Sequence, residues 1–257
     1  CAMPNKAWPF LLVLLMSSGV WGQAADDNRA QGMIQRTIQA LGGEKFLTWK
    51  DMYGHGRIFV IKRDGQSWTK FWEYYRWEGK SRTELEKQHE ALADIFNLEL
   101  GKGWTYEYGR VKPKTEEEMR RFRQSEKRNI YNIFRRRWQE DGMKVLYYSP
   151  SDIETVKPME ALEFIDAENF TVTVFFEESV PLPVKVEYQD RNEDGIVLPK
   201  SEMFFRWFRS GGVMAPHRVE FFTRESNTGL VEYTEVNFNV GLADDLFQEP
   251  VPPVKKK

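Results

Sequence analysis

The sequence predicts an α+β protein in which one curved antiparallel sheet is covered by helices on one side. Three observations lead to this fold class. Apolar residues recur with a period of two over most of the chain and with a helical period in two segments. The extended segments are separated by short turns, which favours antiparallel pairing. Aromatic residues make up 14% of the chain. Many lie in the first strands, where they line a space that is either filled by side chains or left as a cavity.

The first 25 residues have the three-part layout of a secretory signal peptide, and we expect residues 1–25 to be removed. Lys6 lies in the polar start, an apolar stretch runs from Trp8 to Met16, and small residues follow at Gly22–Ala25. The apolar stretch is short for a membrane span. We therefore expect the protein outside the cytoplasm, in the periplasm of a host with two membranes. The alternative interpretation is an uncleaved amphipathic anchor.

Composition is compatible with one folded domain, which we place at residues 26–249, followed by a flexible tail at residues 250–257. The chain is 41% hydrophobic, enough to build a core. Its formal net charge of −2 does not indicate a nucleic-acid partner. The only cysteine, Cys1, lies in the leader, so the domain has no disulfide and no thiolate chemistry. No internal repeat or linker divides the domain, and we expect a monomer.

The domain is expected to begin with an amphipathic helix that Asp26 or Asp27 caps and Gly42-Gly43 ends. A short helical segment follows at residues 44–49. The period then changes to two, and tight turns such as Asp64-Gly65 separate the extended segments. The first group of strands is expected at residues 56–63, 67–78, 81–88, 95–100 and 104–108.

A central helical segment from Thr115 to about Asp141 separates two groups of strands. Thr115 and Glu118 have the spacing of a capping box. The segment is one helix, or two joined near Asn129, with a narrow apolar stripe. We favour a solvated basic face balanced by nearby carboxylates over a surface for anionic lipid or an acidic partner. That face carries Arg120, Arg121, Arg123, Lys127, Arg128, Arg135, Arg136 and Arg137.

The second group of strands follows the helical segment, again with turn residues between strands and no long helix. Asp244-Asp245 is expected to cap a terminal turn. The strands of this group are expected at residues 145–148, 161–166, 171–177, 183–188, 200–209, 216–224 and 230–239.

The sequence carries no recognised catalytic or metal-binding motif, so we expect no enzyme, no metal and no cofactor. His55, His89 and His217 fall in different expected elements, without the spacing of zinc ligands. No G-x-S-x-G, phosphate-binding loop or dinucleotide-binding glycine motif fits a strand-to-helix transition. An enzyme on this scaffold is a minor alternative.

Several short motifs resemble one known family. They are Ala40-Leu41-Gly42-Gly43, Tyr53-Gly54-His55-Gly56-Arg57-Ile58, Gly103-Trp104-Thr105-Tyr106, Met214–Glu220, Val236–Val240, and the closing Asp244-Asp245-Leu246-Phe247-Gln248-Glu249-Pro250. Together they resemble the LolA/LolB superfamily of outer-membrane lipoprotein-sorting-like proteins over most of the domain. The resemblance implies an unclosed β-barrel of about eleven antiparallel strands with helices as a lid over an apolar cavity. It also implies carriage or sensing of lipids or lipoproteins in the periplasm.

We therefore expect a periplasmic, non-catalytic binding or carrier protein for lipid or for the acyl chains of a lipoprotein. The alternative is an envelope sensor or protein-interaction module that engages an envelope protein through the basic helix or a sheet edge. Face alternation and the helical stripe select the candidate cavity residues. These are Phe59, Ile61, Phe71, Tyr75, Trp77, Leu98, Phe134 and Trp138.

Overall fold

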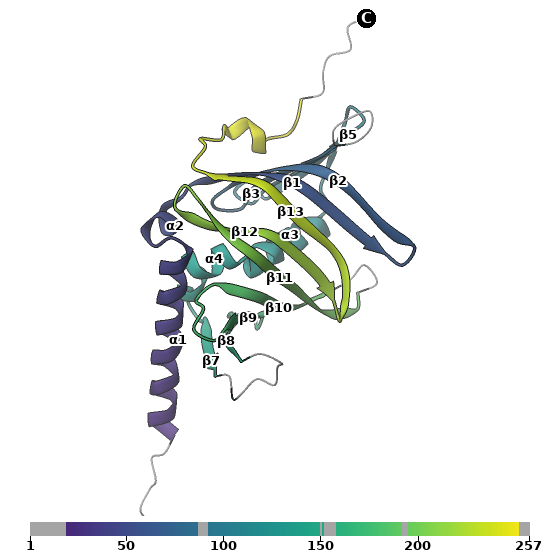
Figure 1. Ribbon diagram of the computed structural model, residues 1–257. Coiled ribbons are helices and arrows are strands. Elements are labelled where there is room, and N and C mark those ends of the chain that lie inside the picture. The colour runs from purple at the N-terminus through teal and green to yellow at the C-terminus, as the bar shows by residue number, and fades with distance from the viewer. Residues whose placement is uncertain (1–18, 87–91, 150, 152–157, 192–194, 252–257) are drawn as a thin grey trace, which may run out of the picture.

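The computed structural model describes residues 19–86, 92–149, 151, 158–191 and 195–251, and shows one large curved sheet with helices against its concave face (Figure 1). Residues 1–18 of the expected signal peptide, and most of the expected tail, lie outside the described residues. Within the described part of the chain, no helix combines the length and the hydropathy needed to cross a bilayer.

Thirteen strands form the sheet, more than the eleven that the resemblance implies. Alternation predicted twelve of these strands, five before the helical segment and seven after it. The strand that it did not reveal is β6, whose four residues include one aliphatic side chain and end in a proline. The strands are β1 Asp51–Lys62, β2 Gly65–Arg76, β3 Lys80–Leu85, β4 Leu92–Asn97, β5 Lys102–Glu107, β6 Arg110–Pro113, β7 Lys144–Tyr148, β8 Met159–Ile165, β9 Thr171–Glu177, β10 Pro183–Arg191, β11 Val197–Ser210, β12 Val213–Thr223 and β13 Ser226–Phe238.

The strand order is β6-β5-β4-β3-β2-β1-β13-β12-β11-β10-β9-β8-β7, so almost every strand pairs with its neighbour in sequence. The exception is the antiparallel pairing of β1 with β13, which joins the two strand groups in the middle of the sheet. The sheet is therefore open, with free edges at β6 and β7. The helical segment between these two strands runs across the concave side from one edge to the other (Figure 1).

The helical segment consists of α3 Glu116–Arg128, α4 Ile130–Arg135 and the 3-10 turn η1 Arg137–Gln139. The predicted capping box is present: Glu118 N donates to Thr115 Oγ1 at 3.2 Å, and Thr115 N donates to Glu118 Oε2 at 2.8 Å. Asn129 ends α3 in extended backbone and caps α4 by accepting from Tyr131 N at 2.9 Å. Of the two alternatives that the sequence left open, one helix or two joined near Asn129, the structure has the second.

The N-terminal helix α1 extends over Gly19–Leu41, and the short α2 over Glu44–Thr48. The expected cap at Asp26 or Asp27 is wrong, because both aspartates lie inside α1. The preceding Gln23-Ala24-Ala25 suits a helix, so the helical pattern continues N-terminally past the aspartates. Gly42 ends α1 at a φ of 136°, and a Cβ there would collide with the Gly212 carbonyl, which explains the glycine.

The hydrophobic core lies between the concave face of β1 and β8–β13 and the helices α1, α2 and α4. Alternation in β9 is regular: Val172, Val174 and Phe176 are all at most 1% exposed and point to the core. Met33, Ile34, Ile38 and Leu41 form the buried face of α1, while α4 contributes Ile130, Ile133 and Phe134.

The C-terminal segment covers the convex face, on the other side of the sheet from α3. Its 3-10 turn η3, Asp244–Phe247, buries Phe247 completely, and Asn97 Nδ2 donates to the Phe247 carbonyl at 3.2 Å. The path to η3 is fixed by the Asp51 carboxylate, which accepts backbone N–H groups of residues 240–242 at 2.7–3.2 Å.

Candidate ligand-binding site

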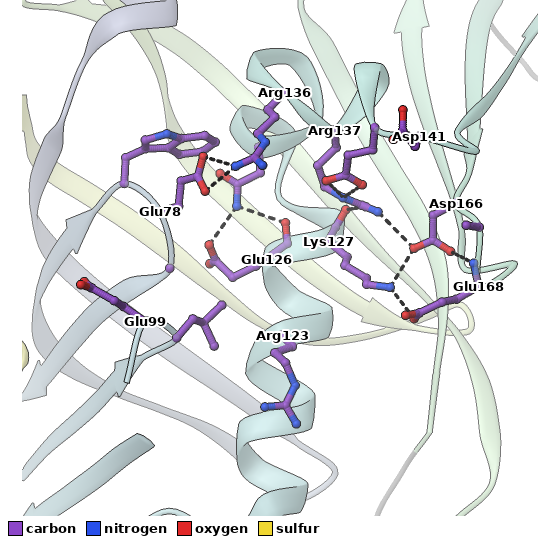
Figure 2. Close-up of a pocket in the computed structure, with 16 residues that line it drawn as sticks. Glu78, Glu99, Arg123, Glu126, Lys127, Arg136, Arg137, Asp141, Asp166 and Glu168 are labelled. Carbon is purple, nitrogen blue, oxygen red and sulfur yellow. Dashed lines mark hydrogen bonds and ion pairs between the residues drawn. The ribbon is translucent and has the colours of Figure 1, made fainter. Parts of the chain in front are cut away.

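Two neighbouring hollows open on the concave side of the sheet. The outer cleft, of about 860 Å³, lies between the helical segment and the turns β2–β3, β4–β5 and β8–β9 (Figure 2). The inner pocket, of about 130 Å³, lies between α4 and the middle strands β1, β2 and β11–β13. Most of its lining is apolar or aromatic, including Trp49, Met52, Phe204, Ala215, Val219 and Val236.

A hydrogen-bonded trio, which we call the partition, stands between the two hollows. Asn132 lines both of them, Tyr75 lines the inner pocket and Glu126 lines the outer cleft. The Tyr75 hydroxyl donates to Glu126 Oε2 at 2.6 Å, and Asn132 Nδ2 donates to the same oxygen at 2.9 Å. Burial raises the pKa of Glu126, although these two hydrogen bonds act in the opposite direction. The partition therefore combines β2, α3 and α4 in one polar contact.

One carboxyl group lines the inner pocket, that of Glu73 on β2. Tyr233 on β13 donates to Glu73 Oε2 at 2.8 Å, and burial raises the pKa of Glu73. Tyr233 pairs with Gly56 on β1, and its ring passes over Gly54, where a Cβ would lie 2.9 Å from the ring. The result is an apolar pocket with a single hydrogen-bonded acid in its wall.

Most residues that line the outer cleft are charged, and its basic side chains are engaged with carboxylates (Figure 2). Lys127 Nζ lies 2.8 Å from Asp166 and 2.7 Å from Glu168. Arg137 Nη2 lies 3.1 Å from the same Asp166. Burial raises the pKa of Asp166, but hydrogen bonds from Lys127 and from two backbone N–H groups outweigh burial, so the pKa is lowered overall. Arg136 Nη1 lies 2.6 Å from Glu78.

The basic face of the helical segment is therefore balanced by acids, which is the interpretation that the sequence favoured. Arg120 and Arg121 pair with Glu117 one turn away, as a helix allows. Other partners come from distant elements: Arg128 Nε lies 3.2 Å from Glu202 on β11. Such long-range partners are not visible in the local charge pattern.

Arg135 has a different role, because its guanidinium lies between two indole rings. Its Cζ is 3.9 Å from the ring centre of Trp77 and 4.5 Å from that of Trp49. It also donates to the carbonyls of Leu47 and Trp49 at 3.0 and 2.9 Å. Burial lowers the pKa of Arg135 to about 10. These contacts attach α4 to the segment between α2 and β1.

The structure brings together only part of the predicted cavity set. Tyr75 lines the inner pocket, and Trp77 and Leu98 line the outer cleft. Phe71 is buried near Tyr233, with ring centres 5.4 Å apart. The remaining four predicted residues lie elsewhere.

Phe134 belongs to the packed core, and the partly buried Trp138 packs against that core; neither lines one of the two hollows. Phe134 is fully buried, with its ring centre 5.8 Å from that of Phe164 and 6.2 Å from that of Phe176. Phe59 and Ile61 lie on the convex face, because Phe59 pairs with Trp68 and therefore shares its face, opposite to Phe71 and Tyr75.

Sequence reasoning missed Glu73, Glu126, Asn132, Trp49 and Tyr233. Glu73 had a detectable signal, since it alternates with Phe71 and Tyr75 on a predicted interior face. The others depend on which distant elements meet. No group of three or more metal-ligating side chains that could hold an ion occurs in the described part of the chain; His55 stacks on Trp72 with ring centres 5.3 Å apart.

No protein-family model matches the sequence, and no curated protein matches it. Solved structures do share the fold. A DUF1329 family protein from Desulfovibrio piger matches with a TM-score of 0.58 and 12% identity, over 85% of this chain and 97% of that one. A putative outer membrane lipoprotein-sorting protein domain from Vibrio parahaemolyticus matches with a TM-score of 0.54 and 14% identity, over 86% and 96%.

A LolA superfamily protein from Nitrosomonas europaea also matches, with a TM-score of 0.54 and 12% identity, over 86% of this chain and 97% of that one. At these identities the likeness concerns the fold alone. It confirms the structural part of the resemblance that the sequence motifs indicated.

Proposed function

We propose that this chain, which has the fold of LolA superfamily proteins, is a non-catalytic binding protein for acyl chains of a lipid or lipoprotein. The observation that carries the proposal is the apolar inner pocket between the concave face and α4, next to a much larger cleft with which it shares the lining residue Asn132. The acyl chain end would occupy the inner pocket, and the polar part of the ligand would occupy the outer cleft.

The two volumes define how much of a ligand each hollow admits. A cavity of ~150 Å³ is large enough for benzene, so the inner pocket of about 130 Å³ accepts only the end of an acyl chain. The outer cleft of about 860 Å³ is within the range of ~300–1,000 Å³ typical of small-molecule sites. A longer chain would require α4 to move at Asn129, where the helical segment has extended backbone.

The proposed setting follows the same reasoning. The leader-like N-terminus favours the periplasm, and the Vibrio relative is described as an outer membrane lipoprotein-sorting domain. We propose a monomer that needs no cofactor. The alternative of an interaction module gains no support from the basic face, because its side chains are engaged in ion pairs within the protein.

The test is to fill the inner pocket and measure binding of a fluorescent fatty acid. Ala215 lines the pocket and is 2% exposed, so Ala215→Leu and Ala215→Phe place side chains into it. We expect at least about tenfold weaker probe binding, with circular dichroism showing that the variants fold. Val240→Phe, at a position 44% exposed, is the matched control and should bind the probe normally. Unchanged probe affinity in both folded Ala215 variants would refute the proposal.

A further inference from the structure

The β1–β2 hairpin extends beyond the rest of the sheet (Figure 1). Pairing of β1 with β13 ends at Val60, and pairing of β2 with β3 begins at Phe71. Thr69 Oγ1 still donates to the Glu86 carbonyl at 2.7 Å. Within the described residues, the strand residues from 61 to 68 therefore pair only with one another. We call residues 57–70 the hairpin tip.

The hairpin tip is apolar on both faces, which packing within one domain does not explain. Phe59, Ile61 and Trp68 share the convex face, while Ile58 and Val60 share the other. Trp68 is 56% exposed and Val60 is 41% exposed. In an antiparallel ribbon in water, one face is normally polar. Exposed apolar side chains on two faces at a projecting tip instead mark an interaction site.

Positive charge surrounds these apolar side chains. Arg57, Lys62, Arg63 and Lys70 lie in the tip with one acidic residue, Asp64, although the chain as a whole has a formal charge of −2. The Arg57 guanidinium lies over the Trp68 ring at 5.1 Å, and Lys70 pairs with Glu86 at 3.0 Å. The two cations nearest the turn, Lys62 and Arg63, are exposed. The hairpin tip thus presents exposed cationic side chains next to the exposed Trp68 ring.

We propose that the hairpin tip docks on the surface of a membrane that contains anionic phospholipid. Tryptophan is enriched at the bilayer interface, and lysine and arginine bind anionic headgroups. A bilayer surrounds both faces of an inserted ribbon, whereas a protein partner would normally cover one face. The two-sided distribution of Ile58, Val60 and Phe59 therefore favours lipid. This proposal does not depend on acyl-chain binding in the inner pocket.

Vesicle flotation tests the proposal, with phosphatidylcholine alone and with phosphatidylcholine mixed with phosphatidylglycerol. We expect the full chain to float with the anionic vesicles, to float much less with the neutral ones, and to bind less as salt is raised. Trp68→Ser and the double variant Lys62→Glu, Arg63→Glu should each reduce binding to anionic vesicles at least about tenfold. Quenching of tryptophan fluorescence by brominated lipid should fall in Trp68→Phe.

Matched controls come from β7 at the edge of the sheet, where Leu146 is 44% exposed and Lys144 is exposed. Leu146→Ser and Lys144→Glu should float like the parent chain. The hairpin variants should still bind the fluorescent fatty acid, which separates this proposal from the proposed function. The inference is overturned if the parent chain does not float with anionic vesicles, even if the tip then binds an acidic protein. It is also overturned if the folded hairpin variants float as well as the control variants.

Discussion

Replacement of Phe134 by alanine tests whether α4 is held to the sheet mainly by core packing. Phe134 is fully buried, and its ring meets those of Phe164 on β8 and Phe176 on β9 nearly edge to face. An aromatic side chain buries ~150–250 Å², and at ~25 cal/mol per Å² this corresponds to about 4–6 kcal/mol. Alanine retains part of that area, so we expect Phe134→Ala to lower the free energy of unfolding by about 3–5 kcal/mol.

The assay is urea unfolding followed by tryptophan fluorescence and circular dichroism, with the denaturant dependence compared between variants. Phe134→Leu keeps most of the volume and should cost less than about 1.5 kcal/mol. If α4 must move for a long acyl chain to enter, Phe134→Ala should also bind the fluorescent fatty acid faster than the parent. A loss below about 1.5 kcal/mol for Phe134→Ala, with unchanged denaturant dependence, would refute the packing argument.

Three further predictions concern buried acids. Burial raises the pKa of Glu126, so the contribution of Glu126 to stability is present at low pH and is lost as pH rises through the folded-state pKa. Glu126→Gln should therefore raise the melting temperature at about pH 8 and change it little at about pH 4. The pKa of Asp166 is lowered overall, so its contribution is lost as pH falls through that pKa. Chemical denaturation should show that Asp166→Asn lowers the free energy of unfolding by about 3–5 kcal/mol at neutral pH. On acidification the variant should then lose less stability than the parent chain, and an equal loss in both would contradict this. Asp51→Ala should cost about 3 kcal/mol and make the segment after β13 sensitive to limited proteolysis, because residues 240–242 lose a charged acceptor.

Elements with a strong local pattern could be predicted from the sequence. The alternation in residues 171–177 gives the observed bounds of β9, and Thr115 with Glu118 forms the predicted capping box. A tight turn joins β1 and β2 where one was expected, although its two residues are Arg63 and Asp64, and Gly65 already belongs to β2. These features depend on residues close together in the chain, so local spacing is sufficient to identify them.

The candidate site was predicted less completely, because alternation assigns a face only where both faces carry informative side chains. In β1 the positions opposite Glu73 and Phe71 on the concave face are Gly54 and Gly56, which have no side chain to reveal their burial. The apolar Phe59 and Ile61 therefore appeared to mark the interior. The partners of the basic helix face, such as Glu202, lie too far along the chain for any local rule to find.

The pairing of β1 with β13 has a consequence for how the chain reaches its native state. Residues from β1 to β6 and from β7 to β13 each form a meander of nearest neighbours, which closes only short loops. The pairing of Met52 with Phe238, by contrast, unites residues from opposite ends of the domain. Contacts between such distant residues have the largest loop-closure cost in entropy. We therefore expect each meander to form on its own and the pairing of β1 with β13 to form last.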